Sequence, residues 1–328
     1  MGTEVSVSSQ LTLVEVAKRT GMDGNILVTA NNLSKINRML QDAPWLPCNN
    51  LTTHIHNVTL SEPSAEARAY NEGTASGAGT TKNIEEPTEM LEKYSVVDQA
   101  LIDIYPEAMR AQMRSQEETI FMRGLAKSMA TNVVYGNRAD DLRNINGLTQ
   151  RYNALTLPNV QDGGDSGSTS TSVWLIQWGP DKVFFCYPSS SSTLGISAND
   201  LGIDTVKDSG GTKEFQAYRT HFKVHYGIVV RDDRAVQRIV SVDPVYGQTN
   251  DLDPADIIAA LNNLPEPDNF EGIAMYCNRQ VKSSLDMMAY NKSNGFYMMP
   301  DIFGKPVSTF QGIPIRLMEA ILSTEIAI

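Results

Sequence analysis

One long amphipathic segment, residues 107–135, constrains the fold of this 328-residue chain more than any other part of it. Pro106 stands just before the segment, where proline suits a first helical turn, and Gly136-Asn137 follows as a stop signal. At about 1.5 Å per residue, a helix of this length is a rod of about 42 Å. Its second half places apolar side chains at the spacing of one helix face: Met122, Leu125, Ala126, Met129, Ala130, Val133 and Val134.

Residues 51–104 predict an extended hairpin before that helix. Two strand-like segments, Leu51–Leu60 and Lys93–Ile104, are rich in Thr, Val and Ile. Residues 66–81 between them are polar and contain three glycines. A compact domain rarely contains so long a connection. We therefore expect this segment to gain order only by contacting another surface.

Residues 1–50 predict an irregular N-terminal arm. Two short helical patterns, Leu11–Lys18 and Leu33–Leu40, are separated by Gly and Asn residues, and the second ends before Pro44. Neither helix is long enough to be stable by itself. The arm should therefore need other surfaces to pack against.

The remaining chain alternates strand and helix patterns and predicts a mixed domain. A helix should begin at Pro254, capped by Asp253, and end near Leu264, and another should span Gln280–Tyr290. The end of the chain, Met318–Ile328, has a strand-like pattern that would return to a sheet begun earlier. Further strands are expected at Val173–Trp178, Lys182–Tyr187, Phe222–Val230, Ile239–Val242 and Gly312–Leu317.

The chain is acidic, with a net charge of −11. A general nucleic-acid binder needs a basic face to neutralise phosphates, so this class of protein is disfavoured. No apolar stretch approaches the roughly 20 residues that cross a bilayer, and the N-terminus has no secretory pattern, so no membrane association is expected. Cys48, Cys186 and Cys277 are widely spaced, which favours reduced, buried thiols in a cytoplasmic protein.

The motifs that could carry catalysis are weak. Residues Gly164–Gly167 read Gly-Asp-Ser-Gly, the local sequence around a serine-protease nucleophile. They lie in a polar Ser/Gly-rich loop, whereas a nucleophile needs a histidine base and an orienting acid. A serine hydrolase that uses Ser166 is therefore kept only as a remote alternative. We predict no catalytic residue.

No cofactor or metal site is predicted either. The chain contains neither GxGxxG nor GxxxxGKS/T. His221 and His225 fall in a predicted strand, where residues four apart lie about 13 Å from each other, too far for one metal ion. His54 and His56 have no carboxylate or thiol at ligand spacing, so structural histidines are favoured.

Three local patterns carry a family resemblance. Arg68–Thr74 is similar to a polar extended-loop segment, and Gly312–Arg316 followed by Ala320–Leu322 resembles a closing strand. Val133–Asn137, followed by Ile145–Leu148, resembles the "YGD … GL" passage that leaves a long helix. These patterns, in the order arm, loop, long helix and mixed domain, resemble the major capsid proteins of tailed bacteriophages, most closely the podovirus-type branch. Their shell fold is named after phage Hong Kong 97 and is shared with bacterial encapsulins.

The resemblance implies an α+β fold of the Hong Kong 97 type, with a hairpin loop that lies over a neighbouring subunit. The Ser/Gly-rich stretch near residues 160–215 cannot be aligned with it. The implied segments are 1–50 as the N-terminal arm, 51–104 as the extended loop, 105–145 as the spine helix and peripheral domain, 146–305 as the axial domain with that insertion, and 306–328 as a strand returning to the peripheral domain.

The implied function is that of a non-enzymatic major capsid protein, which assembles with itself into the hexamers and pentamers of an icosahedral phage head. Such a head encloses double-stranded DNA without sequence-specific binding, and an acidic wall would not stick to it. The protein would be made in the host cytoplasm and reside in the virion. Scaffolding, portal and cementing or decoration proteins are the implied partners. An encapsulin-like compartment subunit is the alternative.

The candidate inter-subunit contacts lie in two places. Some relatives crosslink their loops through Lys and Asn side chains, and Lys82 and Asn83 are of these types, but residue types alone do not predict an isopeptide bond. The run from Arg138 to Arg143 mixes charge signs, which favours surface or inter-subunit ion pairs. The predicted contact residues are Arg68, Tyr70, Glu72, Lys82, Arg138 and Arg143.

Overall fold

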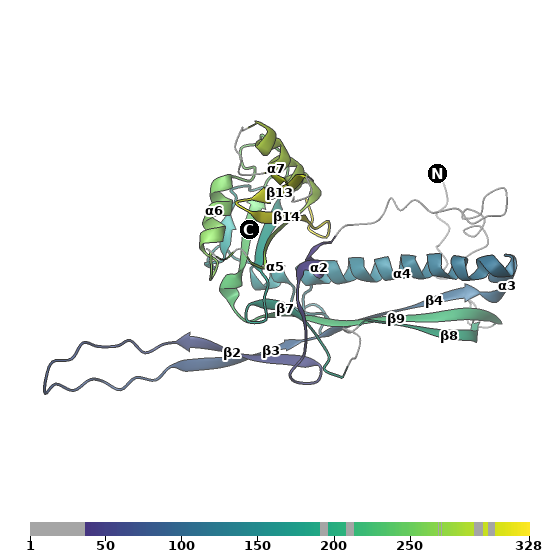
Figure 1. The fold of residues 1–328 in the computed structure, drawn as a ribbon, viewed down its shortest axis with the longest axis horizontal. Coiled ribbons are helices and arrows are strands. Elements are labelled where there is room, and N and C mark those ends of the chain that lie inside the picture. The colour runs from purple at the N-terminus through teal and green to yellow at the C-terminus, as the bar shows by residue number, and fades with distance from the viewer. Residues whose placement is uncertain are drawn as a thin grey trace. The chain divides into compact units, whose positions relative to one another are not determined.

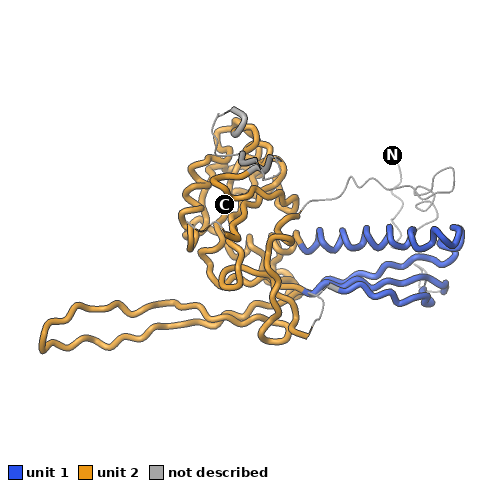
Figure 2. Tube along the Cα trace, in the orientation of Figure 1, with its two compact units in different colours: residues 1–35, 90–129, 195–225 blue, residues 36–89, 130–194, 226–328 orange. Residues whose placement is uncertain are grey.

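The computed structural model describes residues 37–190, 196–207, 213–267, 269, 271–291, 298–300 and 306–328. The chain divides into two compact units, each of which is discontinuous in sequence (Figure 2). The described part of unit 1 comes from Met90–Met129 and Gly195–His225, and that of unit 2 comes from Ile36–Glu89, Ala130–Leu194 and Tyr226–Ile328.

The long helix is confirmed: α4 spans Glu107–Tyr135, 29 residues (Figure 1). Glu107 lies in its first turn, where a negative charge suits the positive helix end. Of the predicted apolar stripe, Leu125, Met129, Ala130, Val133 and Val134 are buried, whereas Ala126 is exposed.

Unit 1 packs a small antiparallel sheet against α4. β8 (Ile196–Lys207) pairs with β9 (Glu214–Val230), and β4 (Glu89–Asp98) lies on the other side of β9. Val97, Ile102, Tyr105 and Met113 form its buried cluster. Alternate residues of β9 face the helix, because a strand turns successive side chains to opposite faces. Among them, the Phe222 ring stacks on Phe121 at 5.8 Å.

The predicted strand Lys93–Ile104 is wrong in its second half. β4 ends at Asp98, and a short helix, α3 (Gln99–Asp103), follows. The side chain of Asp98 accepts a hydrogen bond from the Ala100 N–H at 2.9 Å and caps this helix. The Val and Ile content suggested a strand, but the N-cap sets the local structure.

Unit 2 is built on a seven-stranded sheet in the order β12-β13-β14-β11-β6-β10-β5. β6 and β10 are buried throughout. The predicted strands of this sheet are confirmed within a few residues. Its strands are β5 (Val160–Asp162), β6 (Thr171–Gln177), β10 (Val236–Val242), β11 (Ile273–Cys277), β12 (Met298–Pro300), β13 (Pro306–Phe310) and β14 (Ile313–Leu317).

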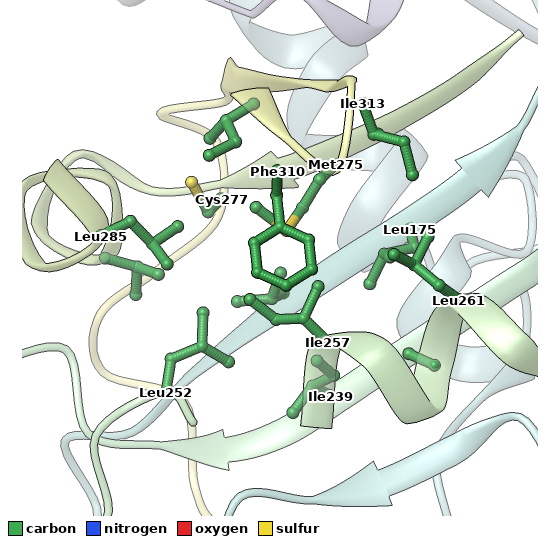
Figure 3. Close-up of a cluster of buried hydrophobic side chains, with 14 of the residues drawn as sticks. Leu175, Ile239, Leu252, Ile257, Leu261, Met275, Cys277, Leu285, Phe310 and Ile313 are labelled. Carbon is green, nitrogen blue, oxygen red and sulfur yellow. The ribbon is translucent and has the colours of Figure 1, made fainter. Parts of the chain in front are cut away.

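Both predicted helices of unit 2 are also confirmed. The first, α6 (Pro254–Asn262), begins as expected, because the Asp253 side chain accepts from the Ala255 N–H at 2.9 Å. The second, α7, spans Arg279–Asn291. Side chains from both helices meet the sheet in one apolar core (Figure 3). Its labelled members are Leu175, Ile239, Leu252, Ile257, Leu261, Met275, Cys277, Leu285, Phe310 and Ile313.

The extended hairpin exists, but its second strand is not the predicted one. β2 (Thr53–Ser61) pairs antiparallel with β3 (Thr80–Pro87) and not with the segment that begins at Lys93. β3 reads Thr-Thr-Lys-Asn-Ile-Glu-Glu-Pro and has no apolar alternation, because most of its side chains are exposed. A strand with two solvated faces carries no periodic signal.

The two ends of unit 2 differ from the sequence expectations in part. Met318–Ile328 is not a strand: the segment is irregular, with single bridges such as Ser170 to Glu325. Near the arm, α2 (Met39–Asp42) is short, and β1 (Trp45–Pro47) pairs parallel with β7 (Val183–Tyr187). The predicted helix Leu11–Lys18 and the first half of Leu33–Leu40 lie outside the described residues.

The segment boundaries at residues 50, 104, 145 and 305 stay predictions. The closing strand β14 pairs with β11 and β13, within the seven-stranded sheet. In the described part of the chain, no helix is both long and apolar enough to span a membrane.

Candidate functional site

The hairpin β2–β3 carries four of the predicted contact residues. β2 and β3 form a two-stranded sheet of their own, and residues 62–79 connect them (Figure 1). Arg68, Tyr70 and Glu72 lie together on this connection, and all are exposed; Tyr70 is 99% exposed. Lys82 lies on β3, opposite Val58 and away from these three. A fully exposed tyrosine beside charged side chains is typical of a surface that contacts another protein.

The base of the hairpin is held by a buried ion pair that the sequence did not reveal. Both oxygens of Glu86 on β3 accept from Arg151 of α5 (Leu148–Arg151), at 2.5 and 2.7 Å. The Glu86 side chain is only 4% exposed. Two parallel hydrogen bonds fix the direction of the strand as well as its position. The pair joins residues 65 positions apart, so no local pattern could have predicted it.

Arg138 and Arg143 lie after α4, in a turn closed by two glycines. The Gly147 N–H donates to Gly136 O at 2.8 Å, and the Arg138 N–H donates to the side chain of Asn146. A methyl group on Gly136 would stand 2.5 Å from Asn132 O, and one on Gly147 would stand 2.6 Å from Gly136 N. This main-chain contact explains physically why the two glycine motifs occur together.

The guanidinium of Arg143 is exposed and pairs with Asp141 at 2.9 Å. That ion pair, together with a backbone hydrogen bond from Arg143, lowers the pKa of Asp141. The structure thus brings Arg138 and Arg143 into one turn, as a group separate from the residues of the hairpin. Arg138 is half-buried, so its side chain offers less surface than that of Arg143.

Glu89 connects the start of β4 to the end of α4 and is buried. Asn132 donates to one carboxylate oxygen at 2.5 Å, while the Ile145 N–H and the Tyr226 hydroxyl donate to the other at 3.4 Å each. Burial raises the pKa of Glu89, although the three donors oppose the shift. The carboxylate fixes the helix end relative to the strand that follows the hairpin.

A second buried charge holds the C-terminal residues. The Arg238 guanidinium pairs with Glu325 at 3.1 Å, donates to Tyr152 O at 2.6 Å and lies over the Trp174 ring. Glu325 also accepts from the hydroxyl of Tyr135, in the last turn of α4. Burial lowers the pKa of Arg238, and Glu325 opposes that shift. This network attaches the chain end to the body of unit 2, which sequence reasoning missed.

The environment of Ser166 is that of a surface loop. Ser166 is exposed, and the neighbouring Asp165 accepts from Ser170 Oγ at 2.7 Å and from the Gly167 N–H at 3.1 Å. The Asp165 carboxylate therefore stabilises the loop, and no histidine is among its hydrogen-bond partners in the described part of the chain.

The predicted burial of the cysteines is confirmed, since Cys48, Cys186 and Cys277 are free and buried. No group of three or more His, Cys, Asp or Glu side chains able to hold a metal ion occurs among the described residues.

Comparisons with known proteins give a consistent result. A family model described as "Major capsid protein GP7" matches residues 21–328. A structure from bacteriophage Epsilon15 matches with a TM-score of 0.72 at 24% identity, over 99% of this chain and 99% of that chain, which shows a shared fold. No curated protein matches.

Other solved structures are more distant. The holo-SrpI encapsulin complex from Synechococcus elongatus matches with a TM-score of 0.46 at 11% identity, over 71% of this chain and 96% of that one. A structure from Mycobacterium phage Bobi has a TM-score of 0.42 at 12% identity, over 71% and 99%.

Proposed function

This chain belongs to the major capsid protein GP7 family, and from that premise we propose that it forms the hexamers and pentamers of a phage head that encloses double-stranded DNA. It is a structural subunit of a phage shell and has the Hong Kong 97-type fold. Family membership also favours this role over the alternative of an encapsulin-like compartment.

The exposed hairpin supports this proposal most directly. An isolated two-stranded hairpin is marginally stable in water. β2 and β3 pair only with each other among the described strands, and both faces are largely exposed. We expect the hairpin to lie on a second copy of the chain, with Arg68, Tyr70, Glu72 and Lys82 in the contact. Because hairpin and receiving surface are unlike, such contacts are heterologous, and they form rings where the rotation between neighbouring copies closes.

Arg138 and Arg143 would form a second contact. Their turn follows the long helix, and Arg143 extends into solvent with a side chain that is 89% exposed. Its ion pair with Asp141 leaves guanidinium N–H groups for a carboxylate of a neighbouring subunit.

We infer that the protein acts by contact and not by catalysis. The family is one of structural proteins, and Ser166 has the loop environment described above. The unmodified protein and the Ser166→Ala variant should show the same, background-level rate of hydrolysis in an esterase or peptidase assay. Hydrolysis by the unmodified protein that Ser166→Ala abolishes would contradict the inference.

The remaining partners follow from the role in the virion. A net charge of −11 suits a wall that encloses DNA without binding it tightly. Synthesis in the host cytoplasm agrees with three free, buried thiols. A scaffolding protein, a portal and a cementing or decoration protein would complete the head.

Electron microscopy of the full-length protein tests the proposal, with closed shells as the expected result. The decisive variant replaces residues 62–79 by a two-residue Asn-Gly turn between Ser61 and Thr80, whose hydroxyls already lie 2.7 Å apart. The shortened protein should fold and lose the ability to form shells. Normal shells from it would contradict the assigned role of the hairpin.

A further inference from the structure

Two histidines lie at the base of the hairpin, where it meets the body of unit 2. His54 and His56 are two residues apart on β2 and therefore share a face of the strand. Glu86, the partner of Arg151, stands opposite His54 on β3. The His54 ring packs edge-on against Phe184 of β7, with centroids 5.2 Å apart, and His56 is only 6% exposed.

The ring nitrogens of these histidines lack the partners that burial normally demands. Both nitrogens of His56 and Nδ1 of His54 are buried without a hydrogen bond among the described residues. A neutral imidazole tolerates this at modest cost. An imidazolium carries a full charge and two donors, so the same environment penalises it far more strongly.

The charged groups around the rings do not compensate for this penalty. Glu86 favours a protonated ring, but both of its oxygens already accept from Arg151. Asp233 acts on His56 in the same direction as Glu86, whereas Arg231 and Arg151 oppose a positive charge there.

Burial is the largest effect and lowers the pKa of both histidines. Arg231 lowers the pKa of each further, and His56 lowers that of His54.

We propose that His54 and His56 form an acid-sensitive latch: while neutral, their rings pack the base of the hairpin against the rest of unit 2, and on protonation the rings leave this buried position, which frees β2 and β3 to move. The released state exposes both rings to water, where an imidazolium is well solvated. This inference concerns the chain itself and does not depend on what the hairpin contacts in an assembled shell.

The direction of the pH effect follows from linkage. A released histidine titrates near its ordinary pKa of about 6.5, and the seated one below it. Above that pH both states are neutral and the latch is fully closed. As the pH falls from 6.5 through the lowered pKa, the seated state becomes less stable, by about tenfold in the equilibrium per pH unit for each proton taken up.

Hydrogen–deuterium exchange of the full-length, unassembled protein between pH 7.5 and pH 5 tests the latch, with labelling times scaled for the intrinsic rate. Peptides from β2 and β3 should keep their protection down to about pH 6.5 and lose it below that pH, by about tenfold per pH unit or more. Peptides from β6 and β10 should not change, which separates local release from unfolding. Uniform loss of protection, or no change in the hairpin, would overturn the proposal.

A double variant, His54→Phe with His56→Phe, removes the titration and retains ring volume. Because the buried ring nitrogens make no hydrogen bond in the described part of the chain, their replacement loses none, and the protein should fold. The protection of the hairpin amides against exchange should then no longer depend on pH. The matched control is His225→Gln in unit 1, a half-buried histidine whose pKa is also lowered by burial but whose charged neighbours are Lys223 and Glu92. An unchanged pH response in the double variant, or its loss in the control, would exclude the latch.

Shell formation by the double variant, scored separately, distinguishes the two proposals. Normal shells at neutral pH with a pH-independent hairpin support the latch and leave the assembly role intact. Failure of the shortened hairpin variant to alter assembly would count against the assembly role alone.

Discussion

Strands β2 and β6 show how differently two parts of one chain can be specified. All seven residues of β6 are buried in unit 2, whereas β2 buries only His56 among its nine. The sequence of β6 is therefore dictated by packing within the chain. That of β2 is constrained by few internal contacts, which leaves most of its surface exposed. In the role proposed above, the hairpin would use that surface to contact another subunit.

The ion pair at the base of the hairpin gives the largest expected change in the free energy of unfolding. Replacing Arg151 with Ala leaves the buried Glu86 carboxylate unpaired, which should lower the free energy of unfolding by about 3–5 kcal/mol. Urea unfolding of the unassembled subunit measures this. The double variant Glu86→Gln with Arg151→Met should recover much of the loss, because no unpaired charge remains. If the single variant were as stable as the unmodified protein, the attachment of the hairpin base would not depend on this ion pair.

A core substitution should affect the body alone. Leu175 is fully buried in the unit 2 core, so Leu175→Ala should cost about 3 kcal/mol through lost burial and a residual cavity. Thermal unfolding followed by tryptophan fluorescence is the measurement. At temperatures where the variant stays folded, its hairpin should exchange hydrogen as in the unmodified protein. A change confined to the hairpin would break the proposed separation of the two regions.

A smaller effect is expected at the start of α6. Asp253→Ala removes the side chain that accepts from Ala255 N–H, at a cost of about 1 kcal/mol. Asp253→Asn keeps an acceptor at the same place and should retain most of the stability. The difference between the two variants in urea unfolding isolates the cap from the charge. Equal losses in both would instead assign the effect to the charge.

The smallest effect on stability is expected at Tyr70. Its ring is fully exposed, so Tyr70→Ala should change the free energy of unfolding by less than about 0.5 kcal/mol. If the hairpin contacts a second copy, the same variant should reduce the yield of shells in electron micrographs. Lys207, an exposed charge on β8, provides a control as Lys207→Gln that should not affect assembly. Normal assembly of Tyr70→Ala would remove this residue from the proposed contact.

The sequence predicted elements whose signal is local. α4 was found because an apolar stripe runs along its second half, Pro106 precedes its start and Gly136 follows its end, and α6 because Asp253-Pro254 is a strong start signal. β3 was missed because Lys82, Glu85 and their neighbours face solvent on both sides. The strand predicted to Ile104 was too long because the cap at Asp98 was overlooked.

The candidate site was predicted only in its exposed part. Arg68, Tyr70 and Glu72 were chosen from a resemblance, and the structure places them together on the connection between β2 and β3. Their role in assembly stays a prediction. The pairing of Glu86 with Arg151 and of Arg238 with Glu325 joins residues 65 and 87 positions apart. Long-range charge pairs of this kind depend on the tertiary fold and leave no pattern in a single sequence.

The contact between Gly136 and Gly147 limits which mutations can restore function after either glycine is replaced. Because main-chain atoms crowd both positions, no change in a neighbouring side chain can make room for a methyl group at either one. A destabilising substitution of a buried side chain can often be rescued by a compensating mutation of a residue that contacts it. Alanine at Gly136 or Gly147 offers no such route, so a genetic selection should recover true revertants there and no suppressors among the neighbouring side chains.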